Sequence, residues 1–187
     1  MTNPPYAVEV DPEFPPDGDW GCPVFEFGHD GGLGGFTSRW GATVVRVTAA
    51  TEWVGLFPGE WPDGVDDVFA TPDPGRLCVV AGGSAFVVRV DSPGEGAVVA
   101  QDRVHQVVPV GDRLVLLVSE VDVVALGPDG VAWRSGRLAG DGLRVVRADP
   151  DAVHCVGNFH YLGEDPQEFV LDPATGRVVA GPRFEWA

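Results

Sequence analysis

The chain has 187 residues and a formal charge of −16, and all of its 12 basic residues are arginine. A chain of this length is one ordinary domain, which can bury about 70% of its unfolded surface without disulfides. Nucleic acid and anionic membranes are excluded as expected partners, because both require clusters of basic side chains. A basic protein partner is favoured instead. The alternative is compositional: a GC-rich genome would also produce a lysine-free chain, whose surface acid serves only solubility.

The three cysteines, Cys22, Cys78 and Cys155, are odd in number, and none belongs to a Cys-x-x-Cys pair. Cys78 and Cys155 lie within apolar strand patterns, where a free cysteine behaves as a small hydrophobic residue. Residues 1–14 contain neither the basic nor the apolar region of a secretion signal, and no stretch approaches the roughly 18 apolar residues of a membrane span. We therefore expect reduced cysteines and a cytoplasmic location.

In chain order, residues 1–60 alternate between short β-rich runs and loops rich in proline, aspartate and glycine. The strands expected there are 7–10, 23–27, 42–48 and 52–57. Residues 11–21 are expected to be irregular, because proline, aspartate and glycine dominate them. Residues 28–35 form a glycine-rich loop, and 42–48 is expected to pair with 52–57.

After residue 60 the pattern becomes regular, and further strands are expected in three successive quartets. These quartets are 68–70, 77–81, 86–90 and 97–100; then 104–108, 114–118, 122–126 and 131–133; then 143–146, 153–157, 168–171 and 177–180. The equivalent positions Leu77, Leu114 and Val153 are 37 and 39 residues apart. This period fits a four-stranded unit and no helical repeat.

These elements predict an all-β fold, a small β-propeller-like array of four-stranded antiparallel units. We expect a single domain over residues 1–187, in which 1–60 is a degenerate or extra unit and 61–187 holds about three repeats. The same strands could instead build a β-sandwich or an open twisted sheet.

Two segments share a motif of strand, tight turn and strand. The first is Val-Ala-Leu-Gly-Pro-Asp-Gly-Val-Ala-Trp at 124–133, and the second is Phe-Val-Leu-Asp-Pro-Ala-Thr-Gly-Arg-Val-Val at 169–179. Through them, residues 68–184 resemble the repeat of quinoprotein-type (PQQ-like) β-propellers. The resemblance implies blade-like hairpins, in which glycine closes the turn and Trp133 packs between neighbouring sheets. It does not imply redox activity, because that family's cofactor and calcium ligands cannot be placed in this sequence.

If each unit runs as four strands in order, the longest loops, 28–41, 58–66 and 157–167, gather on one face of the array. Long loops on a rigid frame are where binding residues concentrate. The predicted binding residues are Trp40, Trp61, Glu60, Asp63, His160, Tyr161, Glu164 and Asp165. Aromatic rings beside carboxylates suit an arginine- or lysine-bearing protein. The alternative is that the two tryptophans fill gaps beneath the loops.

The sequence has no Gly-x-Ser-x-Gly elbow, phosphate-binding loop or calcium-loop motif, so no catalytic residue, metal or cofactor is expected. We expect a non-catalytic acidic protein-interaction module, for instance an intracellular inhibitor or immunity protein for a basic partner. One alternative is a small-ligand-binding or metal-dependent hydrolytic enzyme that uses Asp30, His160 and Glu164. Another is a structural propeller within a larger assembly.

Overall fold

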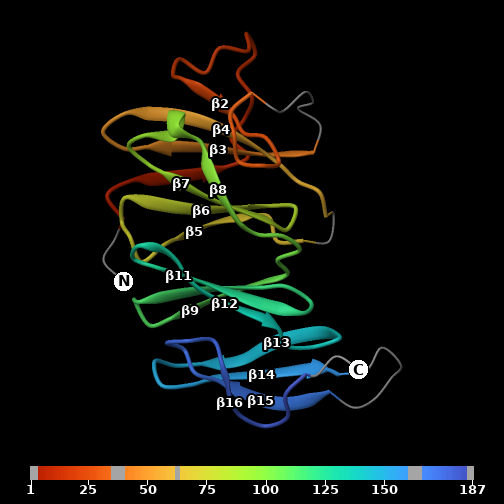
Figure 1. The fold of residues 1–187 in the computed structure, drawn as a ribbon. Helices are drawn as coiled ribbons and strands as arrows, with labels where there is room; N and C mark the ends of the chain where they lie inside the picture. Colours follow the sequence, from red (N-terminus) through yellow and green to blue (C-terminus); the bar gives the residue numbers. More distant parts are fainter. Residues whose placement is uncertain (1–3, 35–40, 62–63, 160–165, 185–187) are drawn as a thin grey trace. The chain divides into compact units, whose positions relative to one another are not determined.

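The computed structural model describes residues 4–34, 41–61, 64–159 and 166–184. Within them, sixteen strands form four sheets of four strands each, and the one helical element is a short 3-10 turn, η1 (Pro93–Glu95) (Figure 1). The all-β fold class expected from the sequence is therefore confirmed. Among the described residues, no helix has the length and apolar character that crossing a membrane requires.

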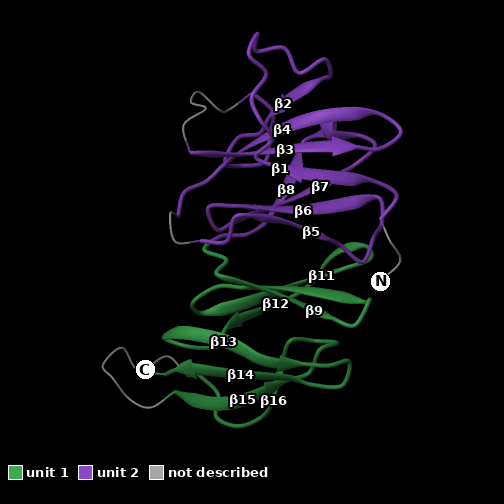
Figure 2. Ribbon diagram, turned by 180° about the vertical axis from the view of Figure 1, so that it is seen from behind, with its two compact units in different colours: residues 1, 103–187 green, residues 2–102 purple. Residues whose placement is uncertain are grey.

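The chain divides into two compact units, residues 2–102 and residues 103–187, here termed the N-terminal unit and the C-terminal unit (Figure 2). Each unit contains two sheets. The N-terminal strands are β1 (Ala7–Val10), β2 (Val24–Glu26), β3 (Ala42–Thr48), β4 (Glu52–Pro58), β5 (Asp67–Ala70), β6 (Arg76–Ala81), β7 (Ser84–Arg89) and β8 (Ala97–Gln101). The C-terminal strands are β9 (Gln106–Val110), β10 (Leu114–Val118), β11 (Asp122–Gly127), β12 (Gly130–Arg137), β13 (Asp141–Ala148), β14 (Val153–Asn158), β15 (Gln167–Leu171) and β16 (Val178–Ala180).

Three of the four sheets are simple meanders, with the strand orders β5-β6-β7-β8, β12-β11-β10-β9 and β13-β14-β15-β16. Their tight turns depend on glycine. Gly82 and Gly83 join β6 to β7, and both have positive φ, at 45° and 78°. Two-residue hairpin turns of this kind need positive φ at both central positions, which glycine adopts without steric cost. The quartets expected after residue 60 thus correspond to three antiparallel sheets.

The first sheet has the order β1-β3-β4-β2 and is mixed. The strands β3 and β4 form the expected antiparallel pair. β2, however, runs parallel to β4, with Val24 opposite Val54. Parallel neighbours cannot be joined by a tight hairpin, because the chain must cross to the other end of the sheet. The sheet built by residues 1–60 therefore departs from a purely antiparallel unit at β2.

Each unit has its own hydrophobic core. In the N-terminal core, Trp53, Phe57 and Phe86 are at most 1% exposed, and the Phe57 ring stacks on Phe27 with the centroids 4.4 Å apart. The C-terminal core consists mainly of valine and leucine side chains from β10, β11, β13, β14 and β15. Burying one such side chain contributes about 1.5–3 kcal/mol to the free energy of unfolding. Period-two alternation along the strands supplies these inward-facing positions.

A tryptophan links the two sheets of each unit. In the N-terminal unit, Trp53 Nε1 on β4 donates a hydrogen bond to the Val90 carbonyl oxygen, at 3.0 Å. In the C-terminal unit, Trp133 Nε1 on β12 donates to the Pro173 carbonyl oxygen, at 2.8 Å. The Trp133 ring lies against Gly176, where an added Cβ would be only 2.4 Å from ring atom Cε3. Trp133 therefore packs between neighbouring sheets, as the sequence motif led us to expect.

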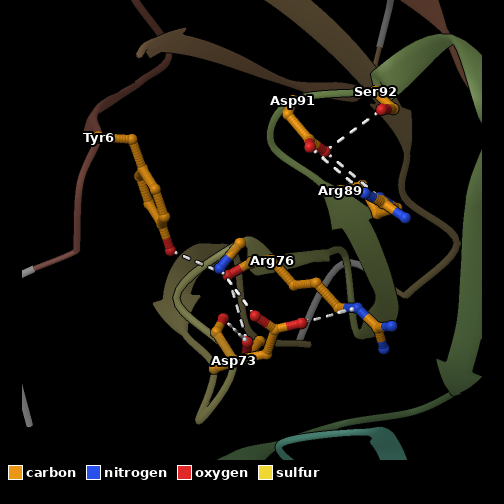
Figure 3. Close-up of polar contacts among 8 residues, drawn as sticks. Tyr6, Asp73, Arg76, Arg89, Asp91 and Ser92 are labelled. Atoms are coloured by element: carbon orange, nitrogen blue, oxygen red, sulfur yellow. Dashed lines mark hydrogen bonds and ion pairs between the residues drawn. The ribbon is translucent and has the colours of Figure 1, made fainter. Parts of the chain in front are cut away.

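A second side chain links the sheets of each unit. In the C-terminal unit, the Gln106 amide on β9 donates to the Val145 carbonyl oxygen at 2.9 Å and accepts from the Val145 N–H at 3.0 Å. In the N-terminal unit, the Tyr6 hydroxyl donates to the Arg76 carbonyl oxygen at 3.1 Å (Figure 3). Both links satisfy a backbone group that strand pairing leaves available.

Candidate functional site

Six of the eight binding residues predicted from the sequence lie outside the described residues: Trp40, Asp63, His160, Tyr161, Glu164 and Asp165. The other two, Glu60 and Trp61, belong to the connection between β4 and β5 in the N-terminal unit. Glu60 is exposed and Trp61 is partly buried. The common face expected for loops 28–41, 58–66 and 157–167 stays a prediction, and the described candidate residues lie in loops of the N-terminal unit.

The glycine-rich loop after β2 brings a histidine to Glu60. His29 Nδ1 lies 3.0 Å from Glu60 Oε1, and the two side chains are 55% and 47% exposed. Solvent screens such a pair, so it contributes little to stability. The neighbouring Asp30 accepts a hydrogen bond from the Gly32 N–H at 3.0 Å. No group of three or more His, Cys, Asp or Glu side chains in the described ranges is arranged to hold a metal ion.

The β4–β5 connection lies directly against the turn between β6 and β7. Trp61 N–H donates to the Gly82 carbonyl oxygen at 2.9 Å, and the Asp66 carboxylate accepts from the Gly82 N–H at 2.9 Å. A Cβ at Gly82 would lie 2.8 Å from the Gly59 Cα, so a side chain there would force the two backbones apart. Glu60 and Trp61 are thus presented on a loop that backbone contacts hold in place.

No sequence motif indicated a second feature, formed by residues 11–23 and here termed the cover segment. It crosses the outer face of the first sheet, which is the face opposite the core, and Trp20 packs there against Val54 and Leu56. Asp11 anchors its start: the Asp11 N–H donates to the Val44 carbonyl oxygen at 2.7 Å, and the Val44 N–H donates to Asp11 Oδ1 at 3.1 Å. At its end, the Val54 N–H donates to the Pro23 carbonyl oxygen at 2.9 Å. The segment is irregular, as expected, yet it is tied to the sheet at both ends.

A pocket of about 300 Å³ lies between the cover segment and the sheet. The residues lining it include Phe14, Trp20, Val24, Glu26, Val44 and Leu56. The Phe14 and Trp20 rings meet edge to face with their centroids 5.4 Å apart. On the sheet side, Leu56 lies between Val44 and Glu26 on adjacent strands. The pocket is therefore mainly apolar, with a carboxylate at one side.

The two units differ in charge. Residues 2–102 contain 16 carboxylate side chains and 4 arginines, a net charge of −12, whereas residues 103–187 contain 12 and 8, a net charge of −4; together these make −16. Each of the three described arginines of the N-terminal unit has a carboxylate partner: Arg46 with Glu52 at 2.6 Å, Arg76 with Asp73 at 3.1 Å and Arg89 with Asp91 at 3.3 Å. Figure 3 shows the last two pairs. The hydrogen bond from Arg89 lowers the pKa of Asp91 below its ordinary value.

The outer face of the β13–β16 sheet carries another hollow, of about 250 Å³. Val146, His154 and Glu168 contribute to its lining, and Val146 is 61% exposed. His154 Nε2 accepts a hydrogen bond from the Arg147 guanidinium at 2.8 Å. Cys155, the next residue, is buried in the core, and burial raises the pKa of its thiol to about 12. The two side chains point to opposite faces of the strand, so they cannot together bind one metal ion.

Comparison with known proteins adds no family assignment. The chain matches no protein-family model, and it matches no curated protein sequence. The resemblance of residues 68–184 to PQQ-like repeats stays a prediction.

Proposed function

We propose that the chain is a non-catalytic, acidic protein-interaction module that binds a basic protein through its N-terminal unit. A small intracellular inhibitor, such as an immunity protein for a basic toxin, is the kind of protein that fits this description. The observation that carries the proposal is the net charge of −12 on residues 2–102, where the three described arginines are already paired with carboxylates.

Electrostatics explains how such a unit would select its partner. A concentration of one sign of charge steers an oppositely charged protein and raises the association rate, and salt weakens this effect. Only a few of the carboxylates are neutralised locally, so the excess is available to a partner. We therefore expect binding that weakens steeply as the ionic strength rises.

The loops that carry the predicted binding residues Glu60 and Trp61 support the same proposal. The Trp61 N–H donates to the Gly82 carbonyl oxygen and the Gly82 N–H donates to the Asp66 carboxylate, so Trp61 is held against the turn between β6 and β7. A surface ordered before binding loses less conformational entropy when a partner docks, and this favours affinity. Of the residues of the enzymatic alternative, His160 and Glu164 lie outside the described residues, and the Asp30 carboxylate accepts the Gly32 N–H.

The test compares capture of partners by three forms of the full chain. One variant removes four charges from the N-terminal unit with Glu9→Gln, Glu13→Gln, Glu60→Gln and Glu95→Gln. A matched variant removes four exposed charges from the C-terminal unit with Asp112→Asn, Asp129→Asn, Asp151→Asn and Glu168→Gln. We expect the natural chain and the C-terminal variant to capture the same basic protein at 50 mM salt, and the N-terminal variant to lose most of it.

Raising the salt to about 300 mM should release that protein from the natural chain, because the Debye length shortens to roughly 6 Å. Quantitative mass spectrometry of the captured proteins provides the measurement. A stoichiometric partner without a basic surface, or equal capture by all three forms, would contradict the proposal.

A further inference from the structure

We propose that the pocket beneath the cover segment is an anchor site for one arginine side chain of the basic partner. This inference rests on the proposed function and goes beyond it, because it assigns a specific receptor to the partner's charge. It concerns residues that no sequence motif indicated: Phe14 and Trp20 from the cover segment, Val44 and Leu56 from the sheet, and Glu26 from β2.

The pocket has the size and apolar surface that the stem of an arginine side chain needs. Its volume of about 300 Å³ stands at the lower end of the range for ligand sites, so it suits one long side chain or a small molecule. Val44 and Leu56 form an aliphatic wall on the sheet, and the Trp20 ring lies on the cover side. The methylene groups of an arginine can pack on such a wall while the guanidinium reaches a polar group.

Glu26 supplies the polar group. It is partly buried at the pocket, and its carboxylate forms no hydrogen bond or ion pair with any residue that the structure describes. A charged donor would bind such a carboxylate through charge-assisted hydrogen bonds. Arg46 lies on the same outer face of the sheet, but it is paired with Glu52 at 2.6 Å. Since all three described arginines of the N-terminal unit are paired with other carboxylates, we assign the cation that complements Glu26 to another molecule.

An arginine suits this pocket better than a lysine or a neutral side chain. The guanidinium is planar and weakly hydrated, and it can bind a carboxylate through two hydrogen bonds while it stacks on an aromatic ring. Trp20 offers such a ring, and Glu26 offers the carboxylate. Glu13, Asp17 and Asp19 are exposed and adjoin the lining residues Phe14, Gly18 and Trp20 in the sequence, so the cover segment is itself acidic. This charge complementarity identifies the occupant as a basic side chain of a protein partner.

Two carboxylates of the cover segment accept hydrogen bonds from backbone N–H groups of the same segment, and these bonds fix the shape of the pocket wall. Asp17 Oδ1 accepts from the Asp19 N–H at 3.1 Å, and Asp19 Oδ1 accepts from the Gly21 N–H at 2.9 Å. Local turns of this type fix the backbone of an irregular segment. The pocket therefore exists before the partner arrives, which lowers the entropic cost of docking.

The test uses two capped tripeptides, Gly-Arg-Gly and Gly-citrulline-Gly, titrated into the full chain. Citrulline has nearly the shape of arginine but carries no charge. Chemical shifts of the Trp20 indole N–H and of the Val44 and Leu56 amides report occupancy of the pocket. We expect the arginine peptide to shift these signals with at least roughly fivefold higher affinity than the citrulline peptide, because a charged hydrogen bond adds to the shared apolar contact. A Gly-Lys-Gly peptide should bind less tightly than Gly-Arg-Gly.

Two variants and one control complete the experiment. Glu26→Gln should lower the affinity for the arginine peptide to that of the citrulline peptide. Val24→Phe, at a position 43% exposed beside the pocket, should narrow it and reduce binding of both peptides. Glu95→Gln removes an exposed charge outside the pocket lining and should leave the peptide affinities unchanged.

Equal affinities for the arginine and citrulline peptides would overturn the proposal, as would binding that Glu26→Gln leaves intact or shifts confined to other residues. This failure is separable from failure of the proposed function, because the four-charge variants used for capture retain Glu26. Charge-dependent capture of a basic protein, without binding of the arginine peptide, would contradict the anchor site alone. Binding of the arginine peptide in the pocket, when no basic protein is captured, would contradict the protein-binding function and would support the arginine site.

Discussion

The N-terminal and C-terminal units each join their two sheets through a tryptophan, but the surroundings of the two tryptophans differ. In both, a tryptophan on one sheet donates its indole N–H to a carbonyl of the other. In the N-terminal unit β2 lies beside β4, so Trp53 is 1% exposed and meets Phe25 edge to face. Trp133 lies on the edge strand β12 and is only partly buried. The same hydrogen bond thus joins the two sheets in both units, while the burial of the tryptophan sets how much it contributes to the free energy of unfolding.

The units also differ in the regularity of their sheets and in their net charge. The C-terminal sheets are meanders, and their unit has a net charge of −4. The N-terminal unit, with a net charge of −12, holds the mixed sheet, the cover segment and the β4–β5 connection. The β4–β5 connection and the pocket beneath the cover segment therefore lie in the unit whose first sheet departs from a simple meander, as expected where binding residues reside in segments added to a rigid frame.

Among the substitutions compared between the units, those of the two tryptophans should give the largest difference in the free energy of unfolding. Trp53→Ala should reduce the free energy of unfolding by about 3–5 kcal/mol, because it opens a cavity in a closed core. Trp133→Ala should cost roughly half as much, because its ring is already partly solvated. Urea unfolding of the full chain gives both values. Equal losses would show that strand position does not control the contribution, and Trp53→Phe, which retains most of the ring volume, is the matched control.

A pair of glycines tests the contact beneath Trp133. Gly176 and Gly136 have nearly equal φ, +67° and +68°, but an added Cβ meets the Trp133 ring at Gly176 and nothing within 4 Å at Gly136. Gly136→Ala should therefore cost only about 1 kcal/mol, for the left-handed backbone. Gly176→Ala should cost about 3 kcal/mol, because overpacking is added. Similar unfolding free energies for the two variants would argue against tight docking of the ring.

Loss of the other side-chain links between sheets, made by Gln106 and Tyr6, should give a smaller difference in the free energy of unfolding. Gln106→Ala removes two hydrogen bonds to Val145 and should cost about 2 kcal/mol, since the Val145 peptide groups lose their partner. Tyr6→Phe removes one hydrogen bond to the Arg76 carbonyl and should cost about 1 kcal/mol. Thermal and urea unfolding would measure both. A larger loss for Tyr6→Phe would reverse the expected order of the two links.

The smallest effect near neutral pH concerns Cys78 and Cys155, one buried thiol in each unit. Burial raises the pKa of each thiol from 9.0 to about 12. The unfolded thiols ionise near pH 9 while the folded ones stay protonated, so they should leave stability unchanged below about pH 8 and reduce it as the pH rises further. Alkylation followed by mass spectrometry should modify the partly exposed Cys22 first. Modification of Cys155 as fast as Cys22 in the folded chain would contradict its burial.

Much of the fold could be predicted because its signals are local. Short runs of valine and leucine mark strands such as β10, and glycine pairs such as Gly82 and Gly83 mark the turns between them. The docking of Trp133 could also be anticipated, because a recognisable hairpin motif ends on it. The docking of Trp53 on the Val90 carbonyl could not, because β4 carries no such motif.

The candidate site was harder to anticipate for the same reason. The aromatic Phe14 and Trp20 stand out among the prolines, aspartates and glycines of the cover segment, and they were the only local signal that this irregular stretch covers something. That the segment crosses the outer face of the first sheet follows from the parallel pairing of β2 with β4. Pairing of distant strands depends on the free energy of the whole unit rather than on adjacent residues.

Composition and periodicity were sufficient for the all-β class, the strand quartets, the reduced cysteines expected in apolar strands and the acidic character, because each depends on residue type and spacing along the chain. Folding in three dimensions was needed to bring Trp20 and Glu26 to one pocket with Val44 and Leu56, and to set His29 against Glu60. Those arrangements join residues far apart in the chain, and the unpaired carboxylate that motivates the arginine site exists only as a result of them.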